Sequence, residues 1–112
     1  MSNFDDVISK CKAQMEEHSI AVDDALLTAI AKSLGPSIYS LDSLTVASSD
    51  PAEMATVHEF ITNKLGVEPG LELEGAIEKA VETLGSGNSH KLRPVFYYLL
   101  VKELGKESQY AG

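Results

Sequence analysis

Apolar side chains recur every three or four residues through each long segment of the chain, the spacing of one face of an α-helix. In the first segment, Val7, Ile8, Cys11 and Met15 form that face. The serines of residues 37–47 compete for backbone hydrogen bonds, so this stretch stays open between one or two helical turns and a loop. The pattern elsewhere predicts helices over residues 3–18, 23–34, 51–65, 71–84 and 89–104.

Glycine follows the last apolar position of four of these segments, at Gly35, Gly66, Gly85 and Gly105. Glycine adopts the left-handed conformation that closes many helices, so each of these residues predicts a helix end. The last segment is apolar on almost every side, which is typical of a buried, central helix.

We therefore predict an all-α fold, a single compact domain of about five helices packed around a hydrophobic C-terminal helix. The domain spans residues 1–112. An N-terminal helix and linker occupy residues 1–22, and we expect a frayed tail over residues 106–112.

The run "SSDPAE" raises the question of whether its hydroxyls and carboxylate are catalytic or start a helix. With Asp50 as N-cap, Pro51 is the first helical residue, where its missing N–H costs nothing. Glu53 then falls at the third position, from which it is predicted to reach back to the cap N–H. Ser48 and Ser49 have no histidine base nearby in a nucleophile motif, so the helix start is favoured.

Pro94 conflicts with a regular last helix that begins at Ser89, because the N–H that proline lacks would bond the carbonyl of His90. Either the helix proper begins close to Pro94, or its first turn is distorted.

The composition is that of an ordinary globular protein, with 44% apolar and 23% charged residues among 112. A single cysteine excludes an internal disulfide and favours a reducing, cytoplasmic location. We find no apolar stretch of signal-peptide or membrane-spanning length, and therefore predict no membrane partner. The net charge of −8 argues against a nucleic-acid partner.

The histidines, the cysteine and the tyrosines supply little recognisable chemistry. His18, His58 and His90 have no metal-ligand spacing, so no metal, cofactor or catalytic residue is predicted. Cys11 lies on an apolar face and is expected to be a core residue. For Tyr97, Tyr98 and Tyr110 we expect core packing, with one hydroxyl reaching a partner.

Glu74, Glu78 and Glu82 follow one another at four-residue spacing along one predicted helix. Like charges at this spacing slightly destabilise a helix. The line is interpreted as a solvated acidic face, while a docking face for a basic partner and a weak cation site stay open as alternatives.

A candidate anion site lies in the loop "GSGNSHKLR". Up to His90, five lysines stand against fifteen acidic residues, whereas from Lys91 onward four basic residues outnumber two acidic ones. Free N–H groups beside basic side chains can hold a phosphate. The alternative is an ordinary loop, with Arg93 or Lys91 paired to a surface carboxylate. The candidate ligands of the anion are Gly87, Asn88, Ser89, Lys91 and Arg93.

The chain resembles a family of small bacterial proteins known as domain of unknown function 2853. The resemblance rests on "GPSIYSLD", "VASSDPAEM", "ITNKLG" and "HKLRPVFYYLLVKELGKESQY", and it covers residues 27–110. One departure is Pro94, where the family pattern has a small helix former. The resemblance implies a small helical protein, and it implies no activity or site residue.

Two functions remain as hypotheses. The first is a non-enzymatic cytoplasmic domain that binds another protein or a second copy of itself. The second is a small-anion or phosphate-binding protein, or a minor enzyme, that uses the loop of residues 85–93.

Overall fold

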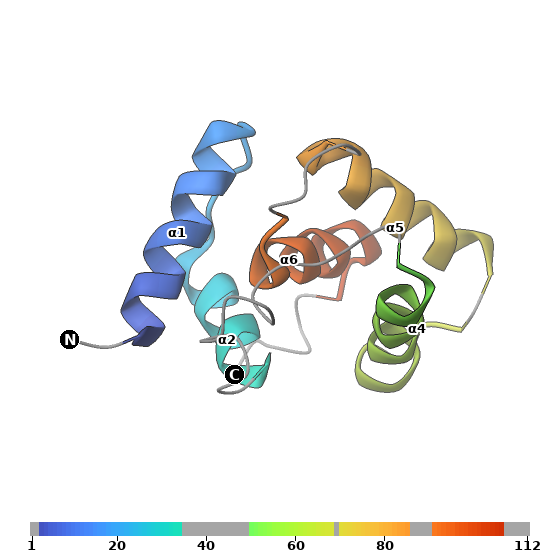
Figure 1. The fold of residues 1–112 in the computed structure, drawn as a ribbon. Helices are drawn as coiled ribbons and strands as arrows, with labels where there is room; N and C mark the ends of the chain where they lie inside the picture. Colours follow the sequence, from blue (N-terminus) through green and yellow to red (C-terminus); the bar gives the residue numbers. More distant parts are fainter. Residues whose placement is uncertain (1–2, 35–49, 69, 86–90, 107–112) are drawn as a thin grey trace.

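The computed structural model describes residues 3–34, 50–68, 70–85 and 91–106 (Figure 1). Within these ranges the chain is helical, apart from short connections and a lone bridge residue, so the predicted all-α class is confirmed. Residues 37–47 and almost all of the predicted tail lie outside the described ranges. The described elements are α1 (Asn3–Glu17), α2 (Asp24–Leu34), α4 (Pro51–Glu59), the π-helix η2 (Phe60–Lys64), α5 (Leu71–Leu84) and α6 (Arg93–Leu104).

The last helix, α6, lies at the centre of the molecule, with α1 and α2 on one side and α4 and α5 on the other (Figure 1). Helices α1, α2 and α5 all pack directly against it. Its buried residues are Pro94, Val95, Phe96, Tyr97, Tyr98, Leu100 and Val101. The sequence prediction of a buried central helix is therefore confirmed.

Tyr98 joins the central helix to the segment that leads into α2. Its hydroxyl donates to the carbonyl of Ala21 at 2.8 Å and accepts from the N–H of Asp23 at 3.1 Å. The side chain is 1% exposed, so these bonds satisfy a buried hydroxyl. This confirms the expected tyrosine hydroxyl with a partner, and it fixes the entry to α2 against the core.

Asp50 caps α4 as predicted. Its backbone is extended, with φ −92° and ψ 116°, and its side chain accepts from the N–H of Ala52 at 2.9 Å. Pro51 occupies the first helical position, where no acceptor is needed for a backbone N–H. The local chemistry of Asp50 and Pro51 therefore accounts for where α4 begins.

Asp50→Ala is expected to lower the free energy of unfolding by about 1 kcal/mol, the usual cost of losing a helix cap. Asp50→Asn keeps a capping oxygen and is expected to lose far less. Urea denaturation followed by circular dichroism measures both. Equal stability of the wild type and Asp50→Ala would show that the observed bond does not stabilise the helix.

The helix predicted over residues 51–65 does not remain α-helical to its end. It continues into η2, where the N–H of Leu65 donates to the carbonyl of Phe60 at 3.3 Å. Val57, Ile61 and Leu65 are spaced four residues apart and are all buried. A turn wider than 3.6 residues keeps this spacing on one face, which explains the departure from the prediction.

The start predicted for the last helix at Ser89 is wrong, since α6 begins at Arg93. Leu92 is its N-cap, with an extended backbone at φ −71° and ψ 133°. Pro94 then takes the second helical position, where a backbone N–H has no acceptor within the helix. The first of the two alternatives for Pro94 is confirmed, and Lys91 precedes the helix rather than lying in its first turn.

Candidate functional site

Arg93, the first residue of α6, pairs with Glu53 in the first turn of α4. Its Nη1 donates to Glu53 Oε2 and its Nη2 donates to Oε1, each at 2.9 Å. The side chains are 14% and 17% exposed, so the pair is largely shielded from solvent. Burial lowers the pKa of Arg93, but the hydrogen bond and charge of Glu53 outweigh it and leave that pKa above its ordinary value.

This pairing corrects the role predicted for Glu53. Both of its carboxylate oxygens accept bonds from Arg93. Within the described part of the chain it makes no bond to the N–H of Asp50, so the predicted capping box is not formed. A two-bond arginine–carboxylate pair fixes orientation as well as charge, so Glu53 ties α4 to the central helix instead.

An aromatic contact lies beside this ion pair. The rings of Phe60 and Tyr97 stack with centroids 4.4 Å apart, and the Tyr97 hydroxyl lies 3.5 Å from Arg93 Nη1. A hollow of about 330 Å³ adjoins the stack and also meets Asn63 and Lys64 of η2. The described contacts therefore give Arg93 and Tyr97 a structural role, which joins η2 and α4 to α6.

The predicted anion site has two residues in the described part of the chain. Lys91 is 2% exposed, and burial lowers its pKa because it disfavours the charged form. Arg93 is held by Glu53, which compensates its charge. Gly87, Asn88 and Ser89 lie outside the described residues, so the site stays a prediction.

His58 connects α4 to α5. One ring nitrogen, Nδ1, lies 2.7 Å from the carbonyl of Met54, and the other, Nε2, lies 2.7 Å from Glu74 Oε2. Both partners accept hydrogen bonds, so a doubly protonated ring satisfies both contacts. The bond to Met54, followed by the bond to Glu74, raises the pKa of His58 above its ordinary value of 6.5.

His58 is expected to give a pH-dependent part of the stability. Because its pKa is raised in the folded state, this part is complete below about pH 6.5 and is lost as the pH rises through the folded pKa. The side chain is 37% exposed, so we expect less than about 1 kcal/mol. The difference in unfolding free energy between wild type and His58→Gln, measured from pH 5.5 to 9, should shrink with pH. A constant difference would contradict the assignment.

Cys11 is confirmed as a core residue. Its side chain is fully buried, and burial raises the pKa of the thiol to about 12. A thiol with that pKa is protonated at neutral pH and is a poor nucleophile. His90 lies outside the described residues, and in the described ranges no group of three metal-binding side chains gathers.

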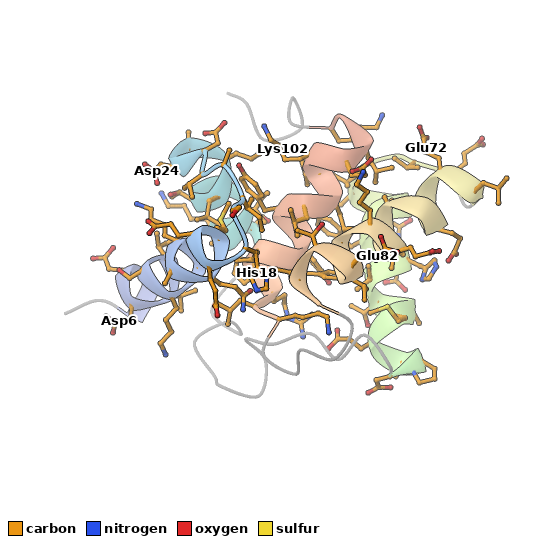
Figure 2. The ribbon with its side chains drawn as sticks, turned by 90° about the horizontal axis from the view of Figure 1, so that it is seen from above. Asp6, His18, Asp24, Glu72, Glu82 and Lys102 are labelled. Carbon is orange, nitrogen blue, oxygen red and sulfur yellow. The ribbon has the colours of Figure 1, made fainter. Side chains whose placement is uncertain are left out.

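The outer face of α5 is strongly acidic. Glu74, Glu78 and Glu82 are all exposed, as is Glu72 at the start of the helix. Figure 2 shows Glu72 near the beginning of α5 and Glu82 towards its end. Glu74 bonds His58, whereas Glu78 and Glu82 form no hydrogen bond or ion pair within the described chain, so this face carries uncompensated negative charge.

Leu71, the first residue of α5, is the most exposed large apolar side chain among the described residues, at 92%. It borders a hollow of about 480 Å³ that also meets Val67, Glu68, Leu104 and Lys106. Sequence reasoning missed this residue because it followed the apolar stripe that begins at Leu73. The available signal was an apolar residue on the polar side of that stripe.

Comparison with protein families gives one finding. The model of the family described as "Protein of unknown function (DUF2853)" matches residues 8–108 of the chain. The match extends further towards the N-terminus than the motifs that carry the resemblance. A comparison with curated proteins finds no match. Among the described residues, no helix combines the length and the apolar character needed to cross a bilayer.

Proposed function

We propose that this chain, which belongs to the DUF2853 family of proteins of unknown function, is a non-enzymatic domain that binds another protein through the start of α5. The exposure of Leu71 beside an open hollow carries the proposal. Single apolar side chains are often exposed on protein surfaces, so what supports the proposal is the position of this nearly fully exposed leucine at the edge of a hollow.

The other large apolar side chains of the described helices support this choice. Among the side chains that the structure describes, Val22, at 37%, is the one other large apolar residue that is exposed. The other large apolar side chains described there pack into or against a single core. Leu71 is therefore not part of a loosely packed surface, and its exposure is specific to this end of the molecule.

The chemistry of the reactive groups also fits a binding role. The thiol of Cys11 is buried, and Arg93, Tyr97 and Tyr98 all make structural contacts. A free, buried cysteine is compatible with a reducing compartment, which supports a proposed cytoplasmic location.

The test is capture of binding proteins from a lysate of the native host on the immobilised chain, followed by mass spectrometry. We expect proteins that bind the wild type and Val22→Asp but not Leu71→Asp. Aspartate is favourable in the first turn of a helix, so Leu71→Asp is expected to keep its fold, which a thermal melt checks.

A second copy of the chain is tested separately, by light scattering of the wild type over a range of concentrations. Identical capture by the wild type and Leu71→Asp, together with a monomer at every concentration, would overturn the proposed function. A dimer that Leu71→Asp dissociates would show that the partner is the chain itself.

A further inference from the structure

Leu71 does not stand alone on α5, because the same outward line of the helix carries Gly75, Glu78 and Glu82. Steps of four, three and four residues place these side chains along one stripe of an α-helix. All four residues are exposed. The opposite side of α5 is the buried one, with Leu73, Ala76, Ile77, Ala80 and Leu84. The stripe therefore faces directly away from the core.

Gly75 has no role in the described fold that requires a glycine. It lies in the second turn of α5, where glycine is less favourable than alanine. A Cβ atom added to it would meet no atom within 4 Å beyond its two chain neighbours and the backbone of its own helix. Glycine allows another backbone to approach closely. Gly75 thus leaves a flat place on the stripe, between the apolar Leu71 and the acidic Glu78.

Charge decides which kind of partner fits this stripe. Its second half carries Glu78 and Glu82, and Glu74 and Lys79 lie beside it. A second copy docked through the same face would bring together two faces that each carry these glutamates, in a chain of net charge −8. Like charges across an interface oppose binding, whereas lysine or arginine side chains would meet complementary charge.

We infer that the partner is a basic amphipathic helix of another protein, which lies along α5 from Leu71 to Glu82. An apolar side chain of the partner contacts Leu71, its backbone approaches at Gly75, and its lysines or arginines pair with Glu78 and Glu82. The stripe spans about 16 Å at 1.5 Å per residue, or about three turns of a partner helix. This inference rests on the proposed function and adds the chemistry of the partner.

Such an interface is small and its charges are exposed, so the binding should be weak and sensitive to salt. The probes are three synthetic peptides. One is an amphipathic helix of leucine, alanine and lysine, one has glutamate in place of lysine, and one is a scrambled sequence of the first composition. Binding is followed by fluorescence anisotropy and by amide NMR shifts of the full chain.

We expect the lysine peptide to give saturable shifts confined to the outward stripe of α5 and the adjoining hollow. Glu78→Lys/Glu82→Lys should weaken binding at least about tenfold, because it places like charges across the interface. The control is Glu16→Lys/Glu17→Lys, which makes the same change in net charge at exposed positions of α1. This control should weaken binding much less.

Gly75→Gln supplies a second readout. Glutamine favours the free helix more than glycine does, so this variant should melt at a higher temperature and yet bind the lysine peptide more weakly. Weaker binding by a stabilised variant cannot come from loss of the fold.

Equal loss of binding in the two charge-reversed variants, or equal affinity for the scrambled peptide, would overturn the inference. Either result would mean that the lysine peptide binds only through the general attraction of an acidic protein for basic chains. A protein captured through Leu71 but unaffected by Glu78→Lys/Glu82→Lys would also overturn it, while leaving the proposed function standing.

Discussion

Phe96→Ala should lower the free energy of unfolding by about 3 to 5 kcal/mol, the usual cost of removing a buried aromatic ring. Phe96 is fully buried in the central helix, and its ring lies 6.3 Å from that of Tyr97. Helices α1, α2 and α5 all pack against α6. Phe96→Ala therefore opens a cavity in α6, the helix against which these three helices pack.

The matched control is Leu99→Ala, since Leu99 lies on the same helix and is only partly buried. Urea denaturation of both variants is expected to show a large shift of the midpoint for Phe96→Ala and a clearly smaller one for Leu99→Ala. Phe96→Leu keeps most of the apolar volume and gives a milder case if Phe96→Ala does not fold. A loss below about 1 kcal/mol for Phe96→Ala would contradict the central position of α6.

The helices and the core could be predicted because their causes are local. The three-to-four residue spacing of apolar positions and the chemistry of single residues such as Asp50 and Gly105 depend on neighbours in sequence. The sequence predicts core tyrosines of which one hydroxyl has a partner, and Tyr98 is such a tyrosine. Its particular partners, the backbone of Ala21 and Asp23, lie more than seventy residues away and leave no local signal.

The features that the sequence did not predict depend on contacts between distant segments. Glu53 has a reasonable local role as a capping residue, but forty residues later the chain supplies Arg93, which takes both of its oxygens. The sequence predicts Lys91 within the first turn of the last helix, as a candidate ligand of an anion, whereas in the fold Lys91 precedes that helix and is buried. Sequence spacing also could not show that the helix widens into a π-helical turn after α4. The wider turn lets Ile61 and Leu65 both be buried, and their burial depends on the rest of the fold.

For the candidate site, the sequence indicated the line Glu74, Glu78 and Glu82 but favoured a solvated acidic face for it. The structure adds two facts that the spacing did not supply. Leu71 is 92% exposed at the start of the same helix, and a Cβ atom at Gly75 would meet no atom beyond its two chain neighbours and the backbone of its own helix. Exposure is a property of the whole fold, so the proposal of a docking face rests on observations that can be made only once the helices are placed.

Arg93→Met should lower the free energy of unfolding by about 3 kcal/mol, mainly because it leaves the carboxylate of Glu53 with no compensating charge in a poorly solvated position. The Glu53 side chain is 17% exposed. The control is Lys12→Met, which breaks an exposed ion pair with Asp24 of similar length, 2.8 Å. That change should cost less than about 1 kcal/mol, as is usual for a solvated pair.

The double variant Arg93→Met/Glu53→Leu separates the charge from the packing. Replacing a buried ion pair with apolar side chains of similar volume is often close to neutral, so this variant is expected to recover most of the stability lost in Arg93→Met. The wild type, Arg93→Met, Glu53→Leu and the double variant form a double-mutant cycle, and equilibrium denaturation at neutral pH gives its coupling energy. If the double variant is as unstable as Arg93→Met, the lost stability does not come from the stranded carboxylate. Arg93 would then act through its other contacts, including the one with Tyr97, and the ion pair would not be what joins α4 to the central helix.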